Sequence, residues 1–179
     1  MDAKARAKIL SEKAKEQQLV ILVYGPGDPG PGGSDELRKY WQKRNQIKEI
    51  LKDTFPRSEV FFSEDLGLRE LTVGLEDLLV EELVHTSIAD CILVLDVSRG
   101  AHVEVDRFSS IPDIACKMRI LIPDRYVGTS GLVSAVHADL RIEGFTKEEF
   151  DKCKLATEKC VNLVMSFAYK KVLQPISWS

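Results

Sequence analysis

Leu19–Tyr24 reads LVILVY and Cys91–Leu95 reads CILVL, and these two runs decide the fold that the sequence predicts. Each run is too short for a helix and apolar at every position, which is typical of a central parallel strand covered on both faces. Segments with helical spacing alternate with strand-like segments along the rest of the chain. This alternation favours parallel pairing through right-handed crossovers, and hence an α/β fold.

Three further strands complete the predicted sheet. Val60–Phe62 is a short apolar segment, and Met118–Ile122 is a longer one that Pro123 ends. Val136–Ile142 alternates between apolar and polar residues, as an edge strand does. The sequence therefore predicts a flavodoxin-like, Rossmann-type three-layer sandwich with a five-stranded parallel sheet in the order 2-1-3-4-5, together with terminal helices.

Helices are predicted over residues 1–17, 34–54 and 75–85, from Ala101 onward, and from Thr146 through Phe167. Residues 1–17 are charged and rich in alanine with a thin apolar stripe, so we expect a peripheral helix. Ser34 is a suitable N-cap, and Thr146 with Glu149 forms a capping-box pattern. We expect the N-terminal helix over 1–17 and a single α/β domain over 18–179.

Bulk properties limit the classes of partner. The chain has 179 residues and a formal net charge of -3, which gives no general attraction to nucleic acid. It shows no signal-peptide pattern and no apolar stretch long enough to cross a membrane. We therefore expect a cytoplasmic protein without a membrane partner.

The cysteines and histidines do not predict a metal site. No cysteine pair has C-x-x-C spacing, so neither zinc nor a disulfide framework is indicated, and buried thiols are expected instead. The histidines are too scattered for a metal site, and no cofactor is required. The residues concerned are Cys91, Cys116, Cys153, Cys160, His85, His102 and His137.

Two loops are expected to meet where the strand order reverses, which is where ligands bind in open α/β sheets. The first is the run GPGDPGPGG at 25–33, in which Gly25 and Gly27 expose backbone N–H groups just before a helix. Such a loop can accept phosphate or sugar oxygens. Asp28 could orient a ribose, although a turn residue in a solvent loop is the alternative.

The second loop is the segment 96–104, which follows the third strand. Asp96 and Glu104 place two carboxylates near one crevice, and such a pair can divide the work of glycosidic bond cleavage. We expect Glu104 in the first turn of the next helix, where an ordinary surface acid is the alternative. Ser98 and Gly100 could present a hydroxyl and a bare backbone to a phosphate.

Several motifs within Val20–Pro123 carry a family resemblance. Leu19–Pro26 (LVILVYGP), Ala89–Asp96 (ADCILVLD) and the G-x-x-x-E segment Gly100–Glu104 resemble nucleoside 2-deoxyribosyltransferase-like proteins. Phe61–Leu66 (FFSEDL) resembles prokaryotic TIR-like proteins, which have a similar sheet.

The resemblance implies that Glu104 attacks the anomeric carbon of a nucleoside or an NAD-type nucleotide, and that Tyr24 and Asp96 orient this glutamate or bind the sugar. Two departures favour hydrolysis over transfer. The Gly/Pro loop is long, and the acidic or amide residue that a neighbouring subunit lends in transferases is not identified here.

The expected function is therefore that of an N-glycosidase or glycosyl-transfer enzyme acting on a nucleoside, nucleotide or NAD-type substrate. A non-catalytic nucleotide sensor is the first alternative. The second is a protein-interaction domain, which should show an exposed apolar patch. A homodimer is also considered, with the C-terminal helix as its interface, although covering the sheet of its own domain is the favoured use of that apolar stripe.

Overall fold

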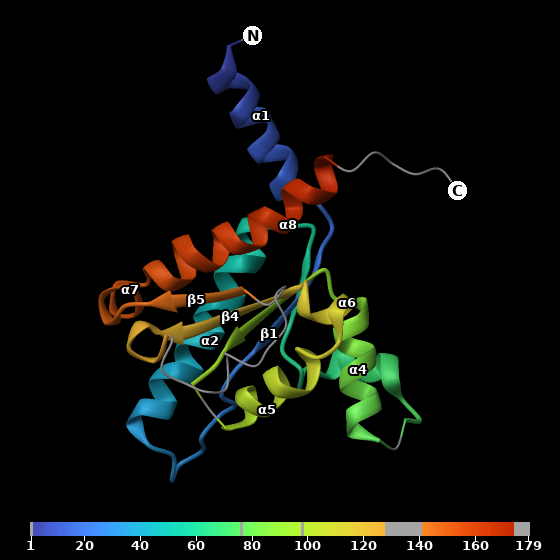
Figure 1. The fold of residues 1–179 in the computed structure, drawn as a ribbon, viewed down its shortest axis with the longest axis vertical. Helices are drawn as coiled ribbons and strands as arrows, with labels where there is room; N and C mark the ends of the chain where they lie inside the picture. Colours follow the sequence, from blue (N-terminus) through green and yellow to red (C-terminus); the bar gives the residue numbers. More distant parts are fainter. Residues whose placement is uncertain (1, 76, 98, 128–140, 174–179) are drawn as a thin grey trace.

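The computed structural model describes residues 2–75, 77–97, 99–127 and 141–173 (Figure 1). Its five parallel strands pair in the order β2-β1-β3-β4-β5, which confirms the predicted topology and fold class. The strands are β1 (Val20–Tyr24), β2 (Glu59–Phe61), β3 (Cys91–Leu95), β4 (Met118–Pro123) and β5 (Arg141–Phe145).

The described helices and helical turns are α1 (Ala3–Lys15), α2 (Asp35–Thr54), α3 (Leu66–Arg69), a 3-10 turn (Glu70–Thr72), α4 (Leu78–Ile88), α5 (Arg99–Phe108), α6 (Pro112–Ala115), a second 3-10 turn (Asp124–Tyr126), α7 (Lys147–Asp151), a π-helical turn (Leu155–Cys160) and α8 (Val161–Leu173). None of the helices in this described part is long and apolar enough to span a membrane.

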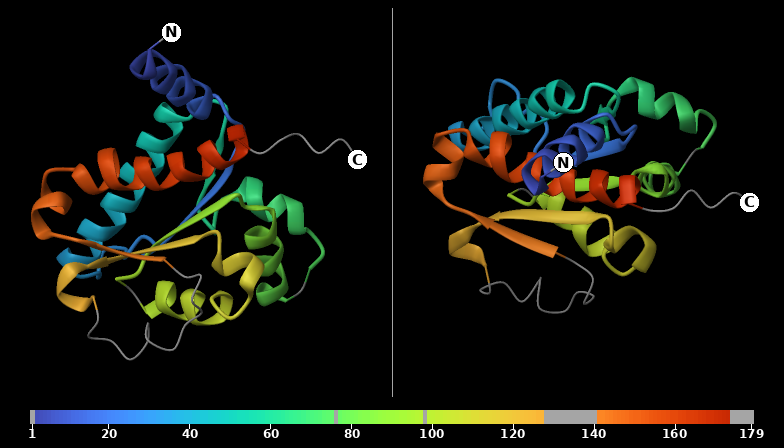
Figure 2. Two further views of the ribbon diagram at one scale, coloured as in Figure 1. Left: turned by 45° about the horizontal axis from the view of Figure 1, so that its top comes forward. Right: turned by 90° about the horizontal axis from the view of Figure 1, so that it is seen from above.

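Helices cover both faces of the sheet (Figure 2), and the strands alternate between two cores. Ile21 and Val23 of β1 pack with α2 and α8 in one core. Leu22 and Tyr24 point the opposite way and pack with α5 and α6 in the other. This alternation is why the central strands are apolar at every position.

The chain ends differ from the prediction in one respect. α1 buries only Ala14 and packs against α8, as expected of a peripheral helix. The predicted capping box at Thr146 and Glu149 is confirmed, but it begins only the short helix α7. Cys153 then adopts a left-handed φ of 62°, which ends α7 and redirects the chain into α8. The predicted continuous C-terminal helix is therefore wrong.

Three boundaries also move. β5 begins at Arg141, whereas the strand was predicted over 136–142, of which residues 136–140 lie outside the described part. α4 begins at Leu78 because the Asp77 side chain accepts a hydrogen bond from the Leu79 N–H at 2.8 Å. α5 begins at Arg99, two residues before the predicted start.

The prediction of buried thiols is correct for two cysteines. Cys91 and Cys160 are buried, whereas Cys153 is half-buried and Cys116 is exposed. Cys116 is exposed because it follows the four-residue helix α6 at the molecular surface, where its thiol donates to the Asp113 carbonyl.

Candidate functional site

The loops after β1 and β3 begin side by side at the carboxyl edge of the sheet. Tyr24 is in register with Val94, and the next residue, Gly25, lies against Leu95. A Cβ atom on Gly25 would lie 3.2 Å from the Leu95 Cβ and 3.3 Å from the Arg44 Cδ. The φ of 155° at Gly25 and this close approach to the end of β3 both favour glycine at the position.

Hydrogen bonds within the Gly/Pro loop and to Arg38 hold the loop in a compact conformation. The Asp28 carboxylate accepts a hydrogen bond from the Gly30 N–H at 2.9 Å, and the Gly33 N–H donates to the Gly30 carbonyl at 3.4 Å. Arg38 of α2 donates to the carbonyls of Gly30 and Gly33 at 3.2 and 3.4 Å. Two loop amides are thus engaged internally, and Asp28 occupies the turn-forming role that was its alternative. A Cβ atom at Gly27 would meet no other group within 4 Å.

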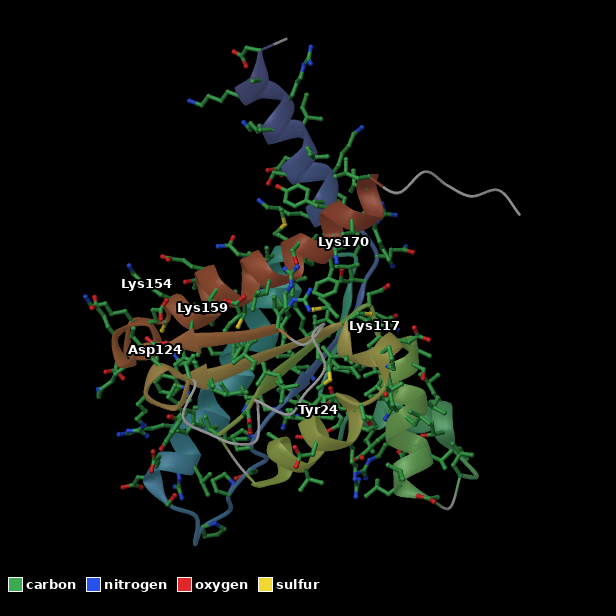
Figure 3. All side chains as sticks on the ribbon, viewed as in Figure 1. Tyr24, Lys117, Asp124, Lys154, Lys159 and Lys170 are labelled. Carbon is green, nitrogen blue, oxygen red and sulfur yellow. The ribbon has the colours of Figure 1, made fainter. Side chains whose placement is uncertain are left out.

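Tyr24 links the end of β1 to α5. Its side chain is 1% exposed and shares a core with Ala101, Val105 and Phe108 (Figure 3). Because α5 begins at Arg99, Glu104 lies in its second turn, and the prediction of the first turn is wrong. The helix dipole acts mainly within the first turn, so it contributes less to Glu104 than expected.

The side chain of Glu104 lies outside the described part of the structure, as do the side-chain surroundings of Gly100 and the whole of Ser98. Asp96 is half-buried one residue beyond β3, and its N–H donates to the Leu121 carbonyl at 3.0 Å.

Arg44 of α2 is a buried cation beneath this edge, and the sequence analysis did not identify it. Its side chain is 2% exposed. Nε and Nη2 donate to the Val23 carbonyl at 3.1 and 2.9 Å, and Nη1 donates to the Pro26 carbonyl at 3.5 Å. Nη1 and Nη2 also contact the two carboxylate oxygens of Glu64 at 2.6 and 2.8 Å. Arg44 therefore ties the end of β1 and the start of the Gly/Pro loop to the loop after β2.

A second cation reinforces this connection. The ring of Phe62 contacts both Arg44 and Lys48, with the guanidinium carbon and the ammonium each 4.1 Å from the ring centroid. Lys48 forms an ion pair with Asp65, whose carboxylate accepts a hydrogen bond from the Phe62 N–H at 2.7 Å. Two cations and two carboxylates thus form a balanced cluster, called the Arg44 cluster below.

Glu64 is the accessible member of this cluster. Its side chain is 45% exposed. Partial burial opposes its ionisation, but the hydrogen bonds and charge of Arg44 outweigh that effect and keep the pKa of Glu64 below its usual value. Glu64 therefore remains ionised at neutral pH and can accept hydrogen bonds from ligand hydroxyl groups. The sequence signal was Phe61–Leu66, where two acids follow the short second strand.

A cavity of about 580 Å³ lies farther along the same edge, beyond β4 and β5. Its aromatic lining consists of Tyr40, Phe145 and Phe150. The rings of Tyr40 and Phe150 pack edge to face, with their centroids 4.9 Å apart. Burial raises the pKa of Tyr40, so its hydroxyl stays protonated. The charged lining residues are Glu36, Lys39, Asp124, Arg125, Lys147 and Asp151. The volume suits a small organic ligand, and the sequence analysis did not predict this cavity.

No family model matches the chain, and no curated protein matches it.

Proposed function

We propose that the protein is an N-glycosidase acting on a nucleoside, nucleotide or NAD-type substrate, with Glu104 as the nucleophile. The observation that carries this proposal is the juxtaposition at Gly25. There the loop after β1 touches the end of β3, and the following helix α5 packs over Tyr24. Crevices of this type bind nucleotides in open parallel sheets.

The proposed reaction uses the carboxyl groups of Glu104 and Asp96. The Glu104 carboxylate forms a bond to the anomeric carbon while the N-glycosidic bond breaks, and the electron pair of that broken bond leaves with the base. The carboxylic acid of Asp96 donates a proton to the departing base. Water then attacks the anomeric carbon and loses a proton to Asp96, while the bond from the sugar to Glu104 breaks and restores both carboxyl groups to their starting forms. The ionised Glu64 supports the proposal because it can accept hydrogen bonds from the sugar hydroxyls.

The test compares wild type with Glu104→Gln on a panel of nucleosides, nucleoside monophosphates and NAD, with free base measured by chromatography. Asp106→Asn is the matched control because Asp106 is an exposed acid on the same helix. We expect wild type and the control to release base and Glu104→Gln to release none. Equal release by Glu104→Gln, or no release by wild type from any compound, would overturn the proposal.

A protein-interaction domain is the second candidate, and one observation favours it. A protein-interaction domain should have an exposed apolar patch. Within one segment of the chain, Leu66, Val73 and Leu78 are 77%, 82% and 61% exposed. Calorimetric titration of the same nucleotide panel separates the two candidates, because an interaction domain without a ligand crevice should bind none of the compounds.

A further inference from the structure

Helix α4 buries two polar residues and exposes several apolar ones. His85 and Thr86 are 1% and 0% exposed, whereas Leu79, Leu83 and Ile88 are 45%, 38% and 43% exposed. Within the described structure, α4 contributes no residue to either apolar core. An amphipathic helix normally buries its apolar stripe, so this outward stripe requires another surface to cover it.

Internal hydrogen bonds hold α4 in this orientation. His85 Nε2 lies 3.3 Å from the Thr72 hydroxyl, and the Thr86 hydroxyl donates to two carbonyls of its own helix at 3.0 Å. Glu82 forms an ion pair with Arg107 of α5 at 3.3 Å. Rotating the helix to bury its leucines would break the contacts of His85 with Thr72 and of Glu82 with Arg107, although the Thr86 bonds are internal to α4 and would persist. α4 therefore cannot cover the stripe by rotation at low cost.

The apolar surface continues into the segment before α4. Nine large apolar residues between positions 66 and 88 are exposed: Leu66, Leu71, Val73, Leu75, Leu78, Leu79, Val80, Leu83 and Ile88. Their exposed fractions add up to roughly five whole residues, on the order of 900 Å² of surface in total. A partner in a standard stable interface contributes about 800 Å². The segment therefore exposes enough apolar surface to supply one side of a protein–protein interface.

We propose that this face, called the α4 face, binds a second copy of the chain in a two-fold symmetric dimer, with the two α4 helices antiparallel. The exposed residues of α4 itself are uncharged, so two copies of this helix can face each other without like charges at their contact, while the acids of residues 64–77 lie on the preceding segment. These exposed residues are Leu78, Leu79, Val80, Leu83, Ser87 and Ile88. Antiparallel packing also opposes the two helix dipoles favourably. This proposal is independent of the proposed reaction.

The charges at the two ends of α4 complement each other in that arrangement. Asp77 and Glu81 lie at its N-terminal end, while Lys117 donates to the Ser87 carbonyl at 2.9 Å near its C-terminal end. Figure 3 shows Lys117 beside α6, next to that end of α4. In an antiparallel pair, the acidic end of one helix faces Lys117 of the other copy.

The charge of the surrounding segment argues against a membrane as the partner. Residues 64–82 contain the acids Glu64, Asp65, Glu70, Glu76, Asp77, Glu81 and Glu82, with Arg69 as the basic residue. An anionic lipid surface would repel this segment, because interfacial helices rely on lysine and arginine at their polar margin.

Sedimentation equilibrium of the full chain across a micromolar concentration series tests the proposal. Leu83→Glu places a charge in the centre of the α4 face at a residue that is already 38% exposed, so the fold should persist. The control is Ile9→Glu on α1, where the replaced side chain is 45% exposed. We expect dimers of wild type and Ile9→Glu, and a dissociation constant for Leu83→Glu raised at least about tenfold.

Exchanging the charges at positions 81 and 117 tests whether the α4 face binds a second copy of the chain with the two α4 helices antiparallel. Glu81→Lys and Lys117→Glu should each weaken the dimer, and the double variant should recover most of the affinity because each helix end again faces an opposite charge. Circular dichroism confirms that every variant is folded. A wild type that remains monomeric, an unchanged dimer of folded Leu83→Glu, or a double variant no better than the single ones would overturn the proposal.

Discussion

Replacing Arg44 with methionine should destabilise the protein substantially, although Arg44 lies on a predominantly charged helix. The substitution keeps the aliphatic bulk and removes five hydrogen bonds, two to the Val23 carbonyl, one to that of Pro26 and two to Glu64. It also removes the cation stacked on Phe62. The end of β1 would lose its connection to the loop after β2.

The magnitude follows from how much water each partner can regain. Removing one member of a fully buried ion pair costs about 3–5 kcal/mol. The Glu64 side chain is 45% exposed and can rehydrate, which lowers the cost, whereas the carbonyls of Val23 and Pro26 lose a charged donor. We therefore expect a loss of about 2–3 kcal/mol in the free energy of unfolding.

Urea unfolding followed by far-ultraviolet circular dichroism measures this loss. The control is Lys52→Met on the same helix. Lys52 forms an ion pair with Glu49, and the two side chains are 46% and 69% exposed. The free energy of unfolding of this control should therefore change by less than about 0.5 kcal/mol. A double-mutant cycle with Glu64→Gln should give a coupling of about 1 kcal/mol or more. If Arg44→Met costs no more than Lys52→Met, the structural role assigned to the Arg44 cluster is wrong.

Two further measurements test the described burial. Burial lowers the pKa of His85 in the folded state, so the unfolded state binds its proton first, and stability should fall as the pH drops below about 6.5. Between about pH 7 and pH 5, the urea midpoint of His85→Gln should fall less than that of wild type. The same fall in both proteins would contradict the burial of His85. A thiol reagent should modify exposed Cys116 rapidly but spare Cys91 and Cys160, because burial raises the pKa of Cys160 to about 12 and that of Cys91 further. Rapid labelling of Cys91 in the folded protein, located by mass spectrometry, would be the contrary result.

The sheet was predictable because its central strands are apolar on both faces. Leu19–Tyr24 and Cys91–Leu95 can be covered only by helices on both sides, and the alternation of strands and helices predicts parallel pairing. The alternation does not fix the order of the strands, and the structure confirms the predicted order 2-1-3-4-5. Arg141–Phe145 was harder to place because it contains Glu143 and Gly144, which are unfavourable in strands. The break at Cys153 has no local signal, since glycine or asparagine is the usual residue at a left-handed position.

The candidate site was predictable only in its position. The topology predicts that the loops after β1 and β3 begin side by side, and the contact of Gly25 with Leu95 agrees with that placement. The pairing of Arg44 with Glu64 depends on how α2 returns to β2, so it cannot be read from residue types alone. The outward stripe of α4 was missed because periodicity shows that a helix is amphipathic but not which face contacts the sheet.

The C-terminal part of α8 and the helix α1 lie at the edge of the sheet opposite the loops after β1 and β3, which matters for attaching the protein to a surface. Lys171 forms an ion pair with Asp90 at 2.8 Å and donates to the Gln18 carbonyl at 3.0 Å, which fixes α8 where β1 and β3 begin. α1 projects from that same edge (Figure 1). Immobilising the protein on a biosensor surface through an exposed residue of α1 would therefore hold it by the edge opposite Gly25. The loops after β1 and β3 would then face the solution that carries the compounds under test.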